Sequence, residues 1–190
     1  MEDTEIEIQV NIKKIQPLLT FLKKKGQFKG KKRQVDTYFI PAHRDFRAQR
    51  PINEWLRLRD TEGKFSINYK NWHRDEEGKS THCDEYETKV EDLKKLKKIF
   101  QVLDFEEIVE VDKERATWVY KDYEIEIDKV KGLGDFVEIE YIGKKAVDPK
   151  NAAREMIQFL KDLGCQGVRL NQQGYAFINL FPNEFISEEV

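Results

Sequence analysis

The chain is poor in the residues that mark several common classes of protein. Its 190 residues include two cysteines, Cys83 and Cys165, which excludes a disulfide-stapled scaffold and offers no zinc-finger spacing. Five prolines and ten glycines leave no low-complexity linker, and no repeat of 20–50 residues is present. Because no run of about 18 apolar residues occurs, no membrane-spanning helix is expected.

Net charge is also nearly absent. The formal charge is −2 although 37% of the residues are charged, so a general attraction to nucleic acid or to a membrane surface is not expected. The basic run Lys25–Arg33 is more typical of a solvated helix end than of a nucleic-acid contact. The first residues are acidic and lack the apolar core of a signal peptide, which with the two unpaired cysteines indicates a cytoplasmic protein.

The sequence does contain charged residues that alternate with apolar ones in one stretch after another. The first is EIEIQV at Glu5–Val10, and the spacing returns in RLR, EYE, KER, EIEID and EIE at 57–59, 85–87, 113–115, 124–128 and 138–140. Residues two apart share one face of a strand, about 7 Å from each other. Each set has a single sign, whereas a solvated face usually mixes signs. The sets therefore line a charged cavity or decorate a wet sheet face.

Periodicity predicts an α+β domain covering residues 1–190, with about eight strands and three helices. The expected strands are 4–10, 33–40, 54–61, 64–72, 81–90, 107–120, 123–130 and 135–142. Helices are expected from Asn11 to Gly26, over 92–103 and over 149–163, and Tyr175–Phe181 is open to a short helix. The KGLGD segment that ends at Asp135 is expected to be a hairpin turn.

Charges of one sign need a partner of the other sign if they face inward. Carboxylates crowded into a partly dry space repel one another by several kcal/mol at an effective dielectric constant of about 20. Oxygen-only ligand sets suit Mg²⁺ or Mn²⁺, which often stay bound to substrate phosphates. The arginines of the basic sets favour phosphate oxygens. A cavity lined this way would hold metal ions and a polyanion.

These motifs resemble the CYTH superfamily, the triphosphate tunnel metalloenzymes, which includes class IV adenylyl cyclases and thiamine triphosphatases. The similarity extends from Glu5 to about Phe181, and its most specific part is EIEIDKVKGLGDFVEIE at Glu124–Glu140. The segment QVDTYFIPAHRDF at Gln34–Phe46 looks most like the class IV cyclase branch. The resemblance implies a closed antiparallel β-barrel, a tunnel, with the helices packed outside.

The resemblance also assigns roles to residues. It implies Mg²⁺ or Mn²⁺ as cofactor, and the metal ligands would be Glu5, Glu7, Asp128, Glu138 and Glu140. The triphosphate would contact Arg57, Arg59, Lys70, Lys113 and Arg115. Catalysis would involve Glu85, Glu87 and Lys70, whereas Glu124 and Glu126 are weaker candidates because that face is free to turn outward near the rim.

Two reactions and one binding role follow from the resemblance. A cyclase would convert ATP to cyclic AMP and pyrophosphate, and a triphosphatase would hydrolyse thiamine triphosphate or inorganic triphosphate. A module that binds a nucleotide or polyphosphate without turnover is the third possibility. The expected partner is thus a triphosphate-bearing small molecule rather than nucleic acid or a membrane, and a homodimer is left open.

Gln9 departs from the family, whose opening motif has lysine at this position. A neutral amide keeps hydrogen bonding but lacks the point charge that a phosphate attracts. For Asp36 and Tyr38, a structural network and a substrate contact are equally expected. The three histidines, His43, His73 and His82, show no ligand spacing and are not expected to bind metal.

The basic residues are expected to repel one another when the cavity holds no ligand. On this view Arg59→Ala would leave the unliganded protein no less stable, because it removes one repelling charge.

Overall fold

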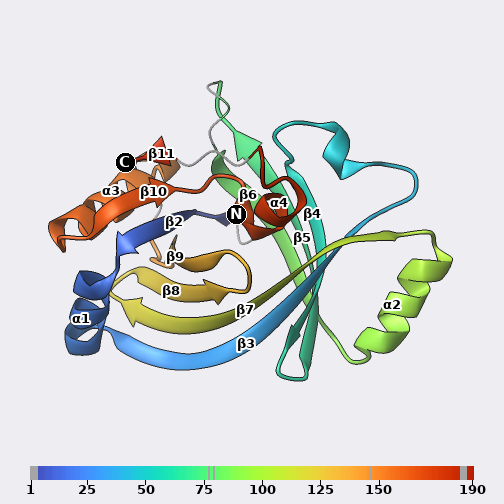
Figure 1. Cartoon of the computed structure of the whole chain (residues 1–190), viewed down its shortest axis with the longest axis horizontal. Helices are drawn as coiled ribbons and strands as arrows, with labels where there is room; N and C mark the ends of the chain where they lie inside the picture. The colour runs from blue at the N-terminus through green and yellow to red at the C-terminus, as the bar shows by residue number, and fades with distance from the viewer. Residues whose placement is uncertain (1–3, 77, 79, 146, 185–187) are drawn as a thin grey trace.

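A computed structural model describes residues 4–76, 78, 80–145, 147–184 and 188–190 (Figure 1). The helices are α1 (Gln16–Lys25), α2 (Leu93–Val102), α3 (Pro149–Asp162) and α4 (Gly174–Leu180), with a 3₁₀ turn at Phe46–Ala48. The strands are β1 (Thr4–Glu5), β2 (Glu7–Lys14), β3 (Gln27–Ile40), β4 (Glu54–Thr61), β5 (Lys64–Arg74), β6 (Ser80–Val90), β7 (Glu106–Tyr120), β8 (Tyr123–Val130), β9 (Gly134–Tyr141), β10 (Gln166–Leu170) and β11 (Glu188–Glu189). Within the described residues, no helix has both the length and the apolar character needed to cross a membrane.

The described strands form one antiparallel sheet in the order β1-β6-β5-β4-β3-β7-β8-β9-β2-β10-β11. The expected α+β class is confirmed. The ladders run from β1 to β11 without closing on themselves, so the expected closed barrel is not confirmed. However, β1 pairs with β6 while β2 pairs with β9, and only Ile6 separates β1 from β2. One stretch of chain therefore brings the β6 side of the sheet close to β9.

The convex face of the sheet carries the main apolar core. Ile8 and Val10 on β2 alternate with the polar residues Glu7 and Gln9, so the apolar side chains point to one face only. Helices α1 and α3 cover this face, and their buried residues join those of β2, β8 and β9 in one cluster (Figure 1). Helix α2 packs separately, with Phe100 against Phe39 and Leu58.

The concave face is apolar only at one end, where α4 packs. On β9, Phe136 shares its face with Glu138 and Glu140 by strand alternation. Phe136 packs in a cluster with Tyr175 and other residues of α4. Because α4 thus covers the continuation of the charged face, it covers one end of the space that the charges line (Figure 1).

Local boundaries differ from expectation at three places. The first helix begins at Gln16 rather than near Asn11, because β2 continues to Lys14 and Pro17 occupies the first turn of the helix. Strand β3 begins at Gln27, six residues before the predicted start, because it pairs with β7 along its whole length. Strand β10 was not predicted, whereas the KGLGD turn is confirmed, with Gly132 and Gly134 at φ of 83° and 98°.

Candidate functional site

The inward-facing charges surround a cavity of ≈ 340 Å³. Its described lining contains eight carboxylates and six cationic side chains, drawn from β2 to β9. They are Glu7, Asp36, Glu85, Glu87, Glu124, Glu126, Glu138 and Glu140, and Arg57, Arg59, Lys70, Arg74, Lys113 and Arg115. Alternation in the strands, rather than proximity in sequence, brings these residues together.

Three glutamates form one row across neighbouring strands. Glu140 on β9 lies directly opposite Glu7 on β2 and Glu124 on β8. Burial, together with the charges of Glu7 and Glu124, raises the pKa of Glu140 to about 7. Directly opposed like charges on a sheet are destabilising. The row therefore favours a proton or a cation between the strands.

A second row combines acids with a buried arginine. Glu138 and Glu126 lie opposite each other on β9 and β8, and the guanidinium of Arg115 forms ion pairs with both. Burial alone would raise the pKa of Glu138, but Arg115 and Lys113 outweigh it and hold this pKa well below its usual range. Burial raises the pKa of Glu126 to about 7 despite Arg115. At neutral pH the two carboxyls thus have different protonation.

Arg57 and Arg59 on β4 share one buried carboxylate. Arg59 donates from Nε and Nη2 to the two oxygens of Asp36 at 2.6 and 2.7 Å. Arg57 Nη1 lies 3.5 Å from Asp36 and its Nη2 lies 3.8 Å from Glu85. Burial opposes ionisation of Asp36, yet the two arginines keep its pKa below its usual value. Asp36 is therefore a structural partner of both cations.

Asp128, which is not part of the cavity lining, pairs with the second set of cations, Lys113 and Arg115. It is fully buried and accepts from Lys113 Nζ at 2.8 Å, from Arg115 Nε at 2.7 Å and from the Tyr175 hydroxyl at 3.0 Å. Lys113 Nζ also lies 4.9 Å from the centre of the Tyr175 ring. Burial lowers the pKa of Lys113, and the charge of Arg115 lowers it further. Asp128 therefore orients the two cations toward the cavity.

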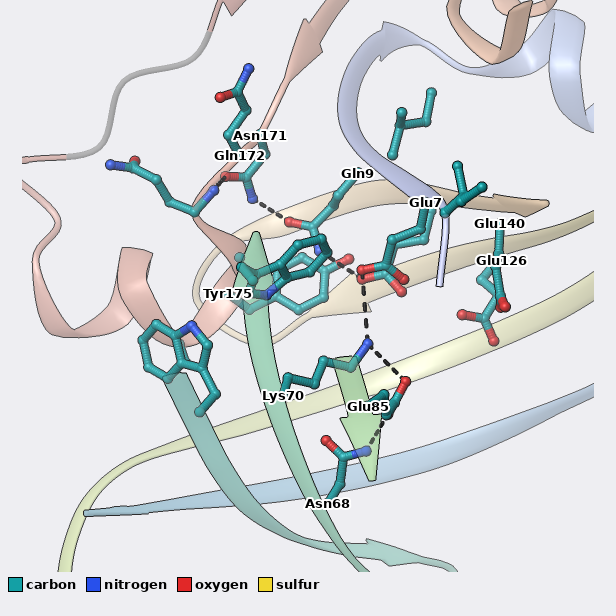
Figure 2. A pocket seen from close by; sticks show the side chains of 18 of the residues that line it. Glu7, Gln9, Asn68, Lys70, Glu85, Glu126, Glu140, Asn171, Gln172 and Tyr175 are labelled. Carbon is teal, nitrogen blue, oxygen red and sulfur yellow. Dashed lines mark hydrogen bonds and ion pairs between the residues drawn. The ribbon is translucent and has the colours of Figure 1, made fainter. Parts of the chain in front are cut away.

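Lys70 lies between acids from two ends of the sheet. Its Nζ is 3.2 Å from Glu85 on β6 and 3.9 Å from Glu7 on β2 (Figure 2). Asn68, one pleat away on β5, donates to Glu85 and also to Glu87 at 3.2 Å. Glu87 is 45% exposed whereas Glu85 is 13% exposed, so the position of the Glu85 side chain is the more restrained of the two.

Gln9 stands where the family has lysine, and both ends of its amide are hydrogen-bonded. Its Nε2 donates to Glu138 at 2.6 Å, and its Oε1 accepts from Asn171 Nδ2 (Figure 2). The Asn171 main-chain N–H also donates to the Gln9 carbonyl at 2.8 Å. Gln9 thus connects β2 and β9 to the segment between β10 and α4, which places Gln172 and Tyr175 at the cavity.

The structure brings together most of the residues predicted from sequence. All five predicted triphosphate contacts line the cavity, as do Glu85, Glu87, Glu7, Glu138 and Glu140. Glu124 and Glu126 also line it rather than turning outward. The side chain of Glu5 is outside the described residues, and Asp128 lies behind the lining.

The predicted repulsion among the cations is present in part, since the charges of Arg115 and Arg59 add to burial in lowering the pKa of Lys113, but none of the five cations is left without an acidic partner. Each of the five predicted triphosphate contacts is paired with at least one carboxylate, as Arg59 is with Asp36. Sequence reasoning also missed Asn171 and Tyr175, since α4 docks onto the charged face through contacts that leave no periodic signal.

The oxygen ligands of the cavity fit a hard divalent cation such as Mg²⁺ or Mn²⁺. The row of Glu7, Glu140 and Glu124 supplies carboxylates only, and the raised pKa of Glu140 reflects its burial beside the negative charges of the other two. No three described carboxylates of the cavity bring their oxygens within 4.8 Å of one another. This spacing suits ions such as Mg²⁺, which use one or two carboxylates together with phosphate oxygens and waters.

A second cavity of ≈ 550 Å³ adjoins the first. The two share five lining residues, Arg59, Glu87, Arg115, Glu124 and Glu126. Four lysines surround the second cavity, Lys29, Lys32, Lys64 and Lys89. The charged lining therefore continues past the acidic rows toward a basic opening.

Fold and cavity together define an α+β protein whose curved antiparallel sheet surrounds charges of both signs. The chain belongs to the CYTH domain family, whose model matches residues 3–175. The family expected from the sequence motifs is thus confirmed.

One related sequence and two solved structures are similar to this chain. A protein of Methanocaldococcus jannaschii named as a putative adenylate cyclase is 36% identical over 172 residues, covering 90% of this chain and 95% of its own. A solved Pyrococcus horikoshii structure has 25% identity and a TM-score of 0.76, covering 93% of this chain and 99% of its own. A Hippeastrum structure, described as a putative adenylyl cyclase with dominant triphosphatase activity, shares the fold at 18% identity and a TM-score of 0.63, with 96% and 97% coverage.

Proposed function

We propose that this chain is a divalent-metal-dependent enzyme that acts on a triphosphate in the charged cavity. The observation that carries the proposal is the charge of the described lining, in which eight carboxylates outnumber six cations. A triphosphate alone would meet net repulsion there. Divalent cations held by the glutamate row would reverse that balance, while the arginines and lysines opposite would contact the phosphate oxygens.

Residues at different positions in the cavity would have different roles in the reaction. Arg57, Arg59, Lys113 and Arg115 would bind phosphate oxygens, and the buried carboxylates Asp36 and Asp128 hold them in place. A bound divalent metal would supply charge neutralisation at the reacting phosphate. Glu140 would hold it together with Glu7 or Glu124, with Glu138 and Glu126 in the next row.

Lys70 and Glu85 would act closest to the reacting phosphorus. Lys70 Nζ lies 3.9 Å from Glu7 of the proposed metal-binding row and 3.2 Å from Glu85, which also contacts Arg57. In this position the ammonium would contact a phosphate oxygen as negative charge develops on it. Glu85, which bonds Lys70 and Asn68, would keep the ammonium in place.

The reaction we propose is of the class IV adenylyl cyclase type. The ribose 3′-oxygen attacks the α-phosphorus of ATP, the bond to the β-phosphate oxygen breaks, and pyrophosphate leaves with its electron pair. The named relative that is 36% identical supports this assignment. Residues Tyr38, Trp55 and Trp72 line the same cavity and offer aromatic surfaces for a base.

Hydrolysis of a triphosphate is the second candidate. It is favoured by the second cavity, which shares lining residues with the first and would give water a route to the terminal phosphate. In this reaction a water oxygen attacks the terminal phosphorus and gives up a proton, the bond from that phosphorus to the bridging oxygen breaks, and orthophosphate and a diphosphate are released. The same cations and carboxylates would serve both reactions.

Product analysis separates the candidates. The protein is incubated with ATP and with inorganic triphosphate under Mg²⁺ or Mn²⁺, and cyclic AMP and orthophosphate are quantified. Cyclic AMP supports the cyclase, and orthophosphate without cyclic AMP supports the triphosphatase. Glu140→Gln should abolish either product, whereas Glu114→Gln, on the exposed outer side of β7, should not. Equal activity in both variants would contradict the proposed site.

A further inference from the structure

Three side chains come together outside the cavity, on the outer face of the β5–β6 hairpin. His73 on β5 lies opposite His82 on β6, with parallel rings whose centres are 4.5 Å apart. Asp84 lies on the same face, with Oδ2 2.7 Å from His73 Nε2. One ligand atom from each of the three lies within 4.8 Å of those of the other two. The strand pairing, which sequence spacing does not reveal, creates this group.

The group faces away from the site already described. Lys70 and Trp72 on β5 line the cavity. Because successive side chains of a strand point to opposite faces, the side chain of His73 points to the outer face. Glu85 on β6 also lines the cavity, which places Asp84 on the outer face beside His73.

A neighbouring hydroxyl already orients one of the histidines. Thr81 Oγ1 donates to the main-chain carbonyl of His73 at 3.2 Å. Thr81 Oγ1 also forms a hydrogen bond of 3.0 Å with His82 Nδ1. With this contact on Nδ1, the other ring nitrogen, Nε2, is the one that would bind a metal. Metal-binding histidines generally have such a second hydrogen bond on the other ring nitrogen.

The remaining pair can exchange a proton for a metal ion. His73 Nε2 and Asp84 Oδ2 form a hydrogen bond of 2.7 Å, and a divalent ion bound between them would displace its proton. The side chains of His73 and Asp84 are 43% and 37% exposed, so little packing restrains them. The stacked rings must turn about χ2 to aim both lone pairs at one ion, and this torsion is soft in histidine.

We propose that His73, His82 and Asp84 bind one divalent transition-metal ion of the zinc class. Imidazole nitrogens suit Zn²⁺, Co²⁺, Ni²⁺ and Cu²⁺, whereas Mg²⁺ prefers oxygen ligands, so this site differs chemically from the glutamate row. Three protein ligands leave a fourth position for water. The ion would tie β5 to β6 on the face opposite Lys70 and Glu85. This assignment does not depend on the proposed function.

Calorimetric titration of the full chain with Zn²⁺, under saturating Mg²⁺, tests the site. The unmodified protein and His43→Ala, which changes an exposed loop histidine, should each bind one Zn²⁺ tightly. Binding should be at least tenfold weaker in His82→Ala and in Asp84→Asn. Equal Zn²⁺ affinity in His82→Ala, or displacement of Zn²⁺ by Mg²⁺, would overturn the proposal.

A second measurement needs no substitution and so does not depend on a variant folding. The chain has three histidines, so their ring proton signals can be followed separately by NMR. One equivalent of Zn²⁺ should shift the signals of His73 and His82 and leave that of His43 in place. Unchanged signals of His73 and His82 would rule the site out.

Discussion

The burial of a charged pair on this sheet decides how much the pair contributes to the stability of the fold. Arg59 and Arg33 make the same two-pronged contact, the first with Asp36 and the second with Asp112. The Arg59 and Asp36 side chains are only 12% and 2% exposed, whereas Arg33 is 62% exposed. Water can replace the partner of Asp112 but not the partner of Asp36. The two arginines therefore form a matched comparison.

Arg59→Ala should destabilise the ligand-free protein, by at most about 3–5 kcal/mol, because the buried Asp36 carboxylate loses both hydrogen bonds from Arg59 and keeps the longer 3.5 Å contact with Arg57. Arg33→Ala should cost far less, since Arg33 is 62% exposed and Asp112, at 17%, is less deeply buried than Asp36, at 2%. Urea unfolding of both variants measures the difference. Adding Asp36→Asn to Arg59→Ala should recover part of the loss. Equal stability of Arg59→Ala and the unmodified protein would restore the repelling-cation picture expected from sequence.

The pH dependence of stability should follow the two carboxyls with raised pKa. Glu140 and Glu126 have a pKa of about 7 in the folded chain against an ordinary 4.5. Between these values the folded state keeps protons that the unfolded state releases, so stability from these groups falls as pH rises from 4.5 to 7. Above pH 7 the contribution of these two groups to stability is constant.

Mg²⁺ should compete with these protons. We expect Mg²⁺ to raise the melting temperature little at pH 5.5 and by several degrees at pH 8, where both carboxyls are ionised. Thermal unfolding at each pH, with Mg²⁺ or an equal ionic strength of NaCl, measures the effect. Glu140→Gln should remove most of the increase at pH 8. An increase of the same size at pH 5.5 would exclude these carboxyls as the metal ligands.

Among the elements, α4 links the apolar end of the concave face to its charged part. Tyr175 packs edge-on against Phe136 and donates its hydroxyl to Asp128. Asp128 in turn holds Lys113 and Arg115. The short helix thus helps to fix two cations that would bind phosphate.

Tyr175→Phe should destabilise the fold by about 1.5–3 kcal/mol, the range for a hydrogen bond to a charged group. The ring and its packing remain, so the change isolates the hydroxyl. Tyr123→Phe is the matched control, because that hydroxyl contacts Glu155 at 3.4 Å on the exposed surface. Chemical unfolding should show a much smaller change for Tyr123→Phe. Equal losses of stability in both variants would mean that the hydrogen bond to Asp128 stabilises the fold no more than the surface contact of Tyr123.

Sequence patterns predicted the elements where alternation was unbroken, as in β4, β5 and β7 to β9. The patterns failed to predict element boundaries that are set by pairing with a distant strand rather than by the local sequence. Asn11 looked like a helix cap but continues β2, because β9 and β10 pair with it on both sides. Gln27–Lys32 looked like a basic loop but pairs with β7. The inward charges were predictable from their spacing, whereas the pairing of each cation with an acid depends on register.

For the whole molecule, the arrangement of charge matters more than its sum. The chain has a net charge of only −2, yet its sheet separates a glutamate row on β2, β8 and β9 from arginines on β4. Lys70 and Arg115 lie between these regions, paired with acids. Such a cavity is suited to a ligand that carries both signs, such as a triphosphate with its divalent cation.

The most direct test is a calorimetric titration with inorganic triphosphate at pH 8, with and without Mg²⁺. We expect tight binding with Mg²⁺, at least tenfold weaker binding without it, and much weaker binding of orthophosphate or sulfate. Glu140→Gln should lose the Mg²⁺-dependent part, and Glu114→Gln should keep it. Triphosphate binding that is the same with and without Mg²⁺, or unchanged in Glu140→Gln, would contradict a metal-bridged triphosphate site in this cavity.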